Sequence, residues 1–223
     1  MMALKTVKMQ DIIDRTVIFV QKTLEGAEAG HDWWHIQRVW NNTKLILETE
    51  QADRLICELT ALLHDIADSK FHNGDEHLGP RIAGEFLTSI GVDETTILHI
   101  QNIILNMSFK ASLGKIEFNS KELEIVQDAD RLDAIGAIGI ARAFTYGGFK
   151  NREIHNPDIP IQSNLDKESY KNTTAPTINH FYEKLLLLKD KMNTPTARQI
   201  AEDRHEYMKS FLQQFHSEWN GLK

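Results

Sequence analysis

The sequence has few of the features that mark secreted or membrane proteins. Its 223 residues include one cysteine, Cys57, which excludes an internal disulfide framework and is typical of a reducing compartment. No apolar run approaches membrane-spanning length, and charged residues interrupt the apolar positions of residues 1–23, unlike a secretory signal. We therefore expect a cytoplasmic protein without a membrane partner, in which Cys57 is a buried helix residue.

The chain also lacks a surplus of positive charge. It has 25 Lys and Arg against 32 Asp and Glu, a formal net charge of −7. A protein that coats nucleic acid needs clustered cations to neutralise the phosphates. We therefore expect no extended nucleic-acid surface, which still allows a local basic pocket.

The alternation of apolar and polar residues that marks β-strands has no useful length here, whereas apolar residues recur widely at helical spacing. Asp32, Asp53, Asp93 and Thr194 are suitable N-caps for four of the helices. The predicted helices span 9–24, 32–50, 53–65, 80–90, 93–105, 122–134, 178–192 and 195–219. With no repeat and no linker, residues 1–223 are predicted to form a single all-α domain.

Three further expectations concern packing. Trp33, Trp34 and Trp40 are assigned to the core rather than to a base-stacking surface. Gly136 and Gly139 are expected to admit a neighbouring helix closely. The long segment 146–177, rich in Gly, Asn, Pro, Ser and Thr, is compatible with a lid over a substrate, a homodimer interface or a mobile stretch.

The residues that suggest chemistry are histidines and aspartates on three predicted helices. His35, the adjacent pair His64 and Asp65, and one carboxylate of the acidic cluster 128–133, for which Asp130 is favoured, offer two imidazoles and two carboxylates. Such donors suit one divalent ion of Mn, Mg, Co, Ni, Fe or Zn and leave positions for water and a substrate oxygen. Asp128 is left unassigned, because it can equally be a helix-terminal carboxylate.

Three local sequences together resemble the HD superfamily of metal-dependent phosphohydrolases, with its H…HD…D signature. They are His31-Asp-Trp-Trp-His-Ile-Gln-Arg-Val39, Leu62-Leu-His-Asp-Ile-Ala-Asp68 and Gln127-Asp-Ala-Asp-Arg-Leu-Asp-Ala134, and the stretch that begins at Asn179 is similar too. The resemblance is to a small bacterial branch that includes nucleotide hydrolases. It implies an HD-domain helical bundle with core motifs in about 31–134 and C-terminal helices in about 178–219.

The resemblance also implies a set of site residues. The metal ligands are His35, His64, Asp65 and Asp130, and the substrate is a small phosphorylated molecule, with a nucleotide the best guess. Near Asn106 there is no paired histidine of the kind that a second metal needs in some members, so one ion is favoured.

Charged residues near these motifs are candidates for catalysis and for substrate binding. Asp68 is placed to orient or deprotonate a metal-bound water, and Arg38 and Lys70 to stabilise phosphate charge. The residues predicted to contact substrate or to support the ligands are His31, Arg131, Asp133 and Lys184.

The sequence is also compatible with simpler roles for these residues. Asp68 and Lys70 are compatible with a surface ion pair, Arg38 with a partner such as Asp32, and His31 with an extra metal ligand. The alternative function is a non-catalytic helical module that senses a nucleotide or binds a partner and keeps a structural metal. A third is another hydrolytic chemistry or an oxygenase chemistry on the same scaffold, because a fold alone does not determine a reaction.

Overall fold

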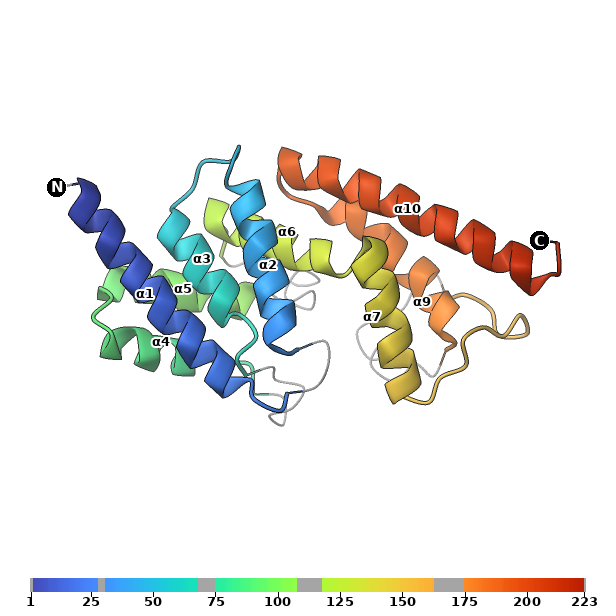
Figure 1. Cartoon of the computed structure of the whole chain (residues 1–223), viewed down its shortest axis with the longest axis horizontal. Helices are drawn as coiled ribbons and strands as arrows, with labels where there is room; N and C mark the ends of the chain where they lie inside the picture. The colour runs from blue at the N-terminus through green and yellow to red at the C-terminus, as the bar shows by residue number, and fades with distance from the viewer. Residues whose placement is uncertain (1, 28–30, 68–74, 108–117, 163–174, 223) are drawn as a thin grey trace. The chain divides into compact units, whose positions relative to one another are not determined.

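The structure is a computed structural model that describes residues 2–27, 31–67, 75–107, 118–162 and 175–222, with side chains from residue 8 onward. Within these ranges the regular structure is helical and includes no strand, which confirms the all-α prediction (Figure 1). The elements are α1 (Met2–Thr23), α2 (Trp33–Ile46), α3 (Arg54–Leu63), α4 (Leu78–Ser89), α5 (Glu94–Asn106), α6 (Lys121–Asp133), α7 (Gly136–Phe149), α9 (Thr177–Glu183), the 3-10 helix η3 (Leu185–Lys191) and α10 (Pro195–Trp219).

Four helices begin where the sequence predicts, because their caps are local. The side chains of Asp32, Asp53, Asp93 and Thr194 each accept a hydrogen bond from the backbone N–H three residues later. Each bond satisfies a donor that the first helical turn leaves without a partner.

The helix predicted over 32–50 ends earlier, at Ile46, and two other predicted helices break within their predicted ranges. The helix at 53–65 stops at Leu63, so His64 and Asp65 lie in the turn that follows α3. The helix at 178–192 is divided at Lys184, whose φ of −144° and ψ of −57° separate α9 from η3. Apolar periodicity continues through both positions, so it does not reveal either break.

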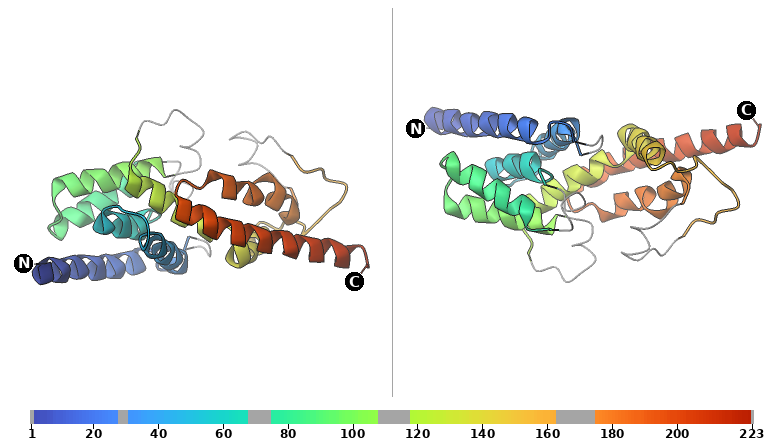
Figure 2. Two further views of the ribbon diagram at one scale, coloured as in Figure 1. Left: turned by 90° about the horizontal axis from the view of Figure 1, so that it is seen from above. Right: turned by 90° about the horizontal axis from the view of Figure 1, so that it is seen from below.

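The chain forms two compact units, Met1–Asp130 and Arg131–Lys223. In the first unit, α3 packs against α1, α2 and α5, and α4 packs against α5. Figure 2 shows α3 between α1 and the α4–α5 pair. Residues Cys57 to Leu63 of α3 are all buried, so this short helix is the centre of the unit's core.

Three side chains of this unit bear on the packing predictions. Cys57 is fully buried, as expected, and burial raises the pKa of its thiol above the ordinary value. Trp34 is 61% exposed, which shows that its assignment to the core was wrong. The indole of Trp40 is half-buried and donates a hydrogen bond of 2.7 Å to Glu58.

In the second unit, α7 packs against α9 and α10, and η3 packs against both α9 and α10. The atoms nearest to a Cβ on Gly139 would be those of the preceding backbone at Ala134, so the tight contact at Gly139 is with its own chain segment rather than with a neighbouring helix. Gly136, at φ +74°, meets the side chain of Arg204 on α10. Gly147 of α7 lies close to Thr177 of α9.

The irregular region predicted over 146–177 begins later than expected, because α7 continues to Phe149. Residues 163–174 lie outside the described part of the chain. Before them, the carbonyls of Glu153 and Ile154 accept the N–H groups of Thr177 and Ile178, at 2.9 and 3.0 Å. These contacts supply partners for the first turn of α9, which has no side-chain cap.

In the part of the chain that the structure describes, no helix combines the length and the apolarity needed to cross a bilayer.

Candidate metal centre

Three of the predicted ligands converge in the first unit from elements far apart in the sequence. The Nε2 atom of His35, on α2, is 3.6 Å from Oδ1 of Asp130 on α6. The Nε2 atom of His64, directly after α3, is 4.0 Å from the same oxygen. The three ligand atoms all lie within 4.8 Å of one another. The His35 side chain is 2% exposed and that of Asp130 is 41% exposed, so the cluster opens to solvent beside the carboxylate.

The early end of α3 orients His64. The Nδ1 atom of His64 lies 2.9 Å from the carbonyl oxygen of Ala61, which can only accept a hydrogen bond. Ala61 is in the last turn of the helix, where carbonyls lack intrahelical partners. Nδ1 therefore carries the proton, and Nε2 presents its lone pair to Asp130 and His35, as a metal-binding imidazole requires.

Asp65 lies beside this cluster and is held by a histidine. Its Oδ2 atom is 2.5 Å from Nδ1 of His31 and 3.9 Å from Nε2 of His35. Burial by itself would raise the pKa of Asp65, but the hydrogen bond from His31 and the charges of His64, His31 and His35 together lower it to about 2. Asp65 is therefore a carboxylate at neutral pH.

The geometry and the donor types fit a single divalent ion. Ligands bound to one ion at about 2.0–2.3 Å are separated from each other by about 3–4.5 Å, depending on the angle between them. The contacts of 3.6 and 4.0 Å between the imidazole nitrogens and Asp130 are in this range. Imidazole combined with carboxylate is the donor set of Zn, Fe, Mn, Co and Ni sites.

Comparison with known proteins identifies the family. The HD domain family matches residues 33–135, which include all four predicted ligands. The uncharacterized protein YpgQ of Bacillus subtilis is 39% identical over 206 residues, which cover 92% of this chain and 92% of YpgQ. The chain belongs to the HD superfamily. The resemblance inferred from the three motifs is therefore confirmed.

Solved structures of HD proteins share the fold. An HD-superfamily hydrolase from Bacillus thuringiensis is 44% identical, with a TM-score of 0.76, and the match covers 95% of this chain and 98% of that one. A structure of Bacillus subtilis YpgQ in complex with ADP is 36% identical, with a TM-score of 0.75, over 95% of this chain and 96% of that one.

Of the three residues predicted to act in catalysis, the structure describes Arg38. Arg38 is half-buried on α2, one turn after His35. Asp68 and Lys70 lie outside the described residues, so their predicted catalytic roles stay predictions.

Three residues predicted to contact substrate belong to the second unit, where they have contacts of their own. The guanidinium of Arg131 donates a hydrogen bond to the carbonyl of Lys191 at the end of η3. Asp133 is buried and forms an ion pair with Arg142 of α7. Lys184 lies at the junction of α9 and η3. The substrate contacts predicted for these residues remain predictions.

Sequence reasoning did not identify Asn42, which supports the centre from α2. Its side-chain amide donates a hydrogen bond of 3.1 Å to the carbonyl of Ala129, the residue before Asp130. This bond ties α2 to α6 next to the ligands. The signal was present in the sequence, since Asn42 is a polar residue two turns after His35 on the same helix face.

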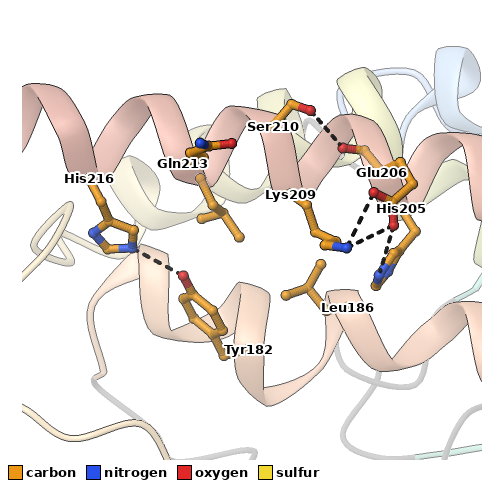
Figure 3. Close-up of a pocket in the computed structure, with 9 residues that line it drawn as sticks. Tyr182, Leu186, His205, Glu206, Lys209, Ser210, Gln213 and His216 are labelled. Carbon is orange, nitrogen blue, oxygen red and sulfur yellow. Dashed lines mark hydrogen bonds and ion pairs between the residues drawn. The ribbon is translucent and has the colours of Figure 1, made fainter. Parts of the chain in front are cut away.

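The second unit contains a hollow whose lining does not include the predicted metal ligands. It measures about 680 Å³ and lies between α10 and the pair of Tyr182 and Leu186 (Figure 3). Its polar groups are largely paired with one another: Tyr182 contacts His216 at 3.1 Å, and Lys209 donates to Glu206 at 2.9 Å. The residues that line it include none of the predicted site residues, so this hollow is not the predicted HD site.

Proposed function

We propose that this HD protein is a metal-dependent phosphohydrolase that acts in the cytoplasm on a small phosphorylated substrate, a nucleotide. The observation that carries the proposal is the convergence of the Nε2 atoms of His35 and His64 on Oδ1 of Asp130, with the proton of His64 held on the opposite nitrogen. The nucleotide is supported by the complex of YpgQ with ADP.

His35, His64, Asp65 and Asp130 would hold one divalent ion. When bound, such an ion polarises a phosphoryl oxygen and lowers the pKa of a bound water, so that hydroxide is available near neutral pH. The protein prepares the ligands: the Ala61 carbonyl keeps the proton on Nδ1 of His64, and His31 orients the carboxylate of Asp65.

The remaining assignments complete the proposal. Arg38 would bind a phosphate oxygen with its planar guanidinium, Lys70 would neutralise phosphate charge, and Asp68 would orient the attacking water. His31 supports the centre through Asp65. Arg131, Asp133 and Lys184 are proposed as substrate contacts of the second unit.

The test is turnover of a substrate panel by purified protein. Nucleoside mono-, di- and triphosphates and cyclic nucleotides are incubated with the protein and Mn, Mg, Co or Ni, and the products are separated by chromatography. We expect metal-dependent release of phosphate or pyrophosphate from at least one nucleotide. The product identifies which bond is cleaved.

A matched pair of histidine variants checks the site. His64→Ala should abolish both metal binding and turnover, whereas His77→Ala, at an exposed position without a side-chain cap bond, should retain both. Turnover that survives in His64→Ala would contradict the site. Tight nucleotide binding without turnover of any substrate would support the alternative, a nucleotide-sensing module with a structural metal.

A further inference from the structure

Trp34 is an exposed aromatic residue on α2, the helix that carries the predicted ligand His35. The buried face of α2 consists of His35, Ile36, Val39, Asn42, Thr43 and Ile46. Trp34 precedes the predicted ligand His35 directly, yet 61% of its surface is exposed. An indole offers a large, flat aromatic face on which another ring can stack.

Helical geometry places this indole next to Arg38. At about 100° per residue, Trp34 and Arg38 are separated by about 40° around α2, and Arg38 and His35 by about 60°. Residues four apart on a helix are direct neighbours, with Cβ atoms about 5–6 Å from each other. One edge of α2 thus presents an exposed aromatic plane, a guanidinium and an imidazole of the metal centre in succession.

The size of the exposed group favours a small ligand over a protein partner. A stable protein interface buries about 800 Å² on each side, far more than one indole. On α2, the other large hydrophobic residue that is exposed is Leu45, at 42%, eleven residues further along the helix. A single flat indole beside a cation matches a flat ring attached to phosphate groups.

We propose that Trp34 stacks on the base of the nucleotide whose phosphates lie at the metal centre, with Arg38 contacting those phosphates. This inference rests on the proposed function and names the part of the substrate that confers recognition. Stacking engages the face of a base rather than its edge, so it tolerates every base. The protein therefore distinguishes nucleotides from phosphates without a base, and discriminates only weakly among the bases.

The test compares two ligands that resist hydrolysis and differ in the nucleoside. Binding of α,β-methylene-ADP and of methylenediphosphonate to the full-length protein with Mn²⁺ is measured by calorimetry. A stacked base contributes about 1–3 kcal/mol. Trp34→Ala should therefore weaken binding of α,β-methylene-ADP about tenfold or more and leave binding of methylenediphosphonate within about twofold, since 1.4 kcal/mol is tenfold.

Two further variants control the experiment. Trp34→Phe keeps an aromatic face and should retain most of the affinity for α,β-methylene-ADP. Trp219→Ala removes an indole that is 49% exposed on α10 and should bind both ligands as the wild type does. Circular dichroism establishes that each variant is folded.

Several results would overturn the inference. They are unchanged binding of α,β-methylene-ADP by Trp34→Ala, equal weakening of both ligands in that variant, and no binding of α,β-methylene-ADP by the wild type. Failure of the proposed function is a separate observation, because it appears as absent turnover while these equilibrium binding differences persist.

Discussion

His64 and Asp65 are adjacent in the chain, yet a different partner orients each of them. The imidazole of His64 donates to a carbonyl of its own helix end, which leaves Nε2 available. The carboxylate of Asp65 is held by His31, 34 residues earlier. At the scale of single residues, the candidate centre therefore depends as much on these second partners as on the ligands.

The contact between His31 and Asp65 gives a prediction for metal affinity. His31→Ala removes the group that orients Asp65, so the affinity for Mn²⁺ should fall about 10- to 100-fold, as is typical when a group that supports a ligand is lost. Calorimetric titration of metal-free protein with Mn²⁺ measures the change. His77→Ala serves as the control, and an unaltered affinity in His31→Ala would show that this contact does not support the metal site.

His180 on α9 gives a prediction for the pH dependence of stability. Burial, with the charges of Lys184 and Arg152, lowers the pKa of His180 from 6.5 to about 3. Below pH 6.5 the unfolded chain therefore binds a proton that the folded chain excludes, and stability falls as the pH drops from 6.5 towards 3. Between pH 7 and pH 5 this residue should cost about 2 kcal/mol.

Urea denaturation at pH 7 and at pH 5 measures this contribution. His180→Gln cannot titrate, so the loss of unfolding free energy between the two pH values should be smaller than in the wild type by about 2 kcal/mol. An identical loss in the two proteins would mean that His180 is not the group responsible.

At the scale of elements, two helix ends present backbone carbonyls that side chains use as hydrogen-bond partners. The stop of α3 at Leu63 frees the Ala61 carbonyl that orients His64. At the end of α6, the carbonyl of Leu132 accepts a hydrogen bond from Arg204 of α10. Such bonds satisfy carbonyls that the last turn of a helix leaves without partners.

Two adjacent glycines of α7 give a matched test of helix packing. A Cβ on Gly147 would lie 2.2 Å from Oγ1 of the buried Thr177, whereas a Cβ on Gly148 would meet nothing within 4 Å. Gly147→Ala should lower the free energy of unfolding by about 1–3 kcal/mol, the usual cost of overpacking. Gly148→Ala should raise it by up to about 1 kcal/mol, because alanine favours the helix.

Urea denaturation of both variants measures the difference. Equal effects of the two substitutions would contradict the close approach of α7 to α9 at Gly147.

At the scale of the whole molecule, His35, His64 and Asp130 come together only in the folded chain, since they are separated by 29 and 66 residues. An ion held by all of them binds the folded state in preference to the unfolded state. Its binding free energy is therefore added to the stability of the protein.

Metal addition should accordingly raise the melting temperature of the wild type. At 1,000 times the Kd, the gain is about 4 kcal/mol, and a protein of this size gains about 2–4 °C per kcal/mol. Differential scanning fluorimetry with Mn²⁺, followed by excess EDTA, measures the shift and its reversal. Asp130→Ala should lose most of the shift, and a full shift in that variant would place the ion elsewhere.

The sequence by itself was sufficient for the features that depend on neighbouring residues. Helical periodicity and the four N-caps predicted an all-α fold, since a cap acts over three residues and a helix face over four. The set of His35, His64, Asp65 and Asp130 was also available, because the motifs around these residues resemble those of the HD superfamily.

Only the tertiary structure decided which carboxylate lies within ligand distance of the two histidines. Asp130, rather than the buried Asp128 or the paired Asp133, lies with His35 and His64, and Asn42 ties α2 to α6 beside it. The exposure of Trp34 was decided in the same way, although its apolar neighbours suggested burial. The physical reason is that burial and ligand geometry depend on contacts between distant segments, which local periodicity does not encode.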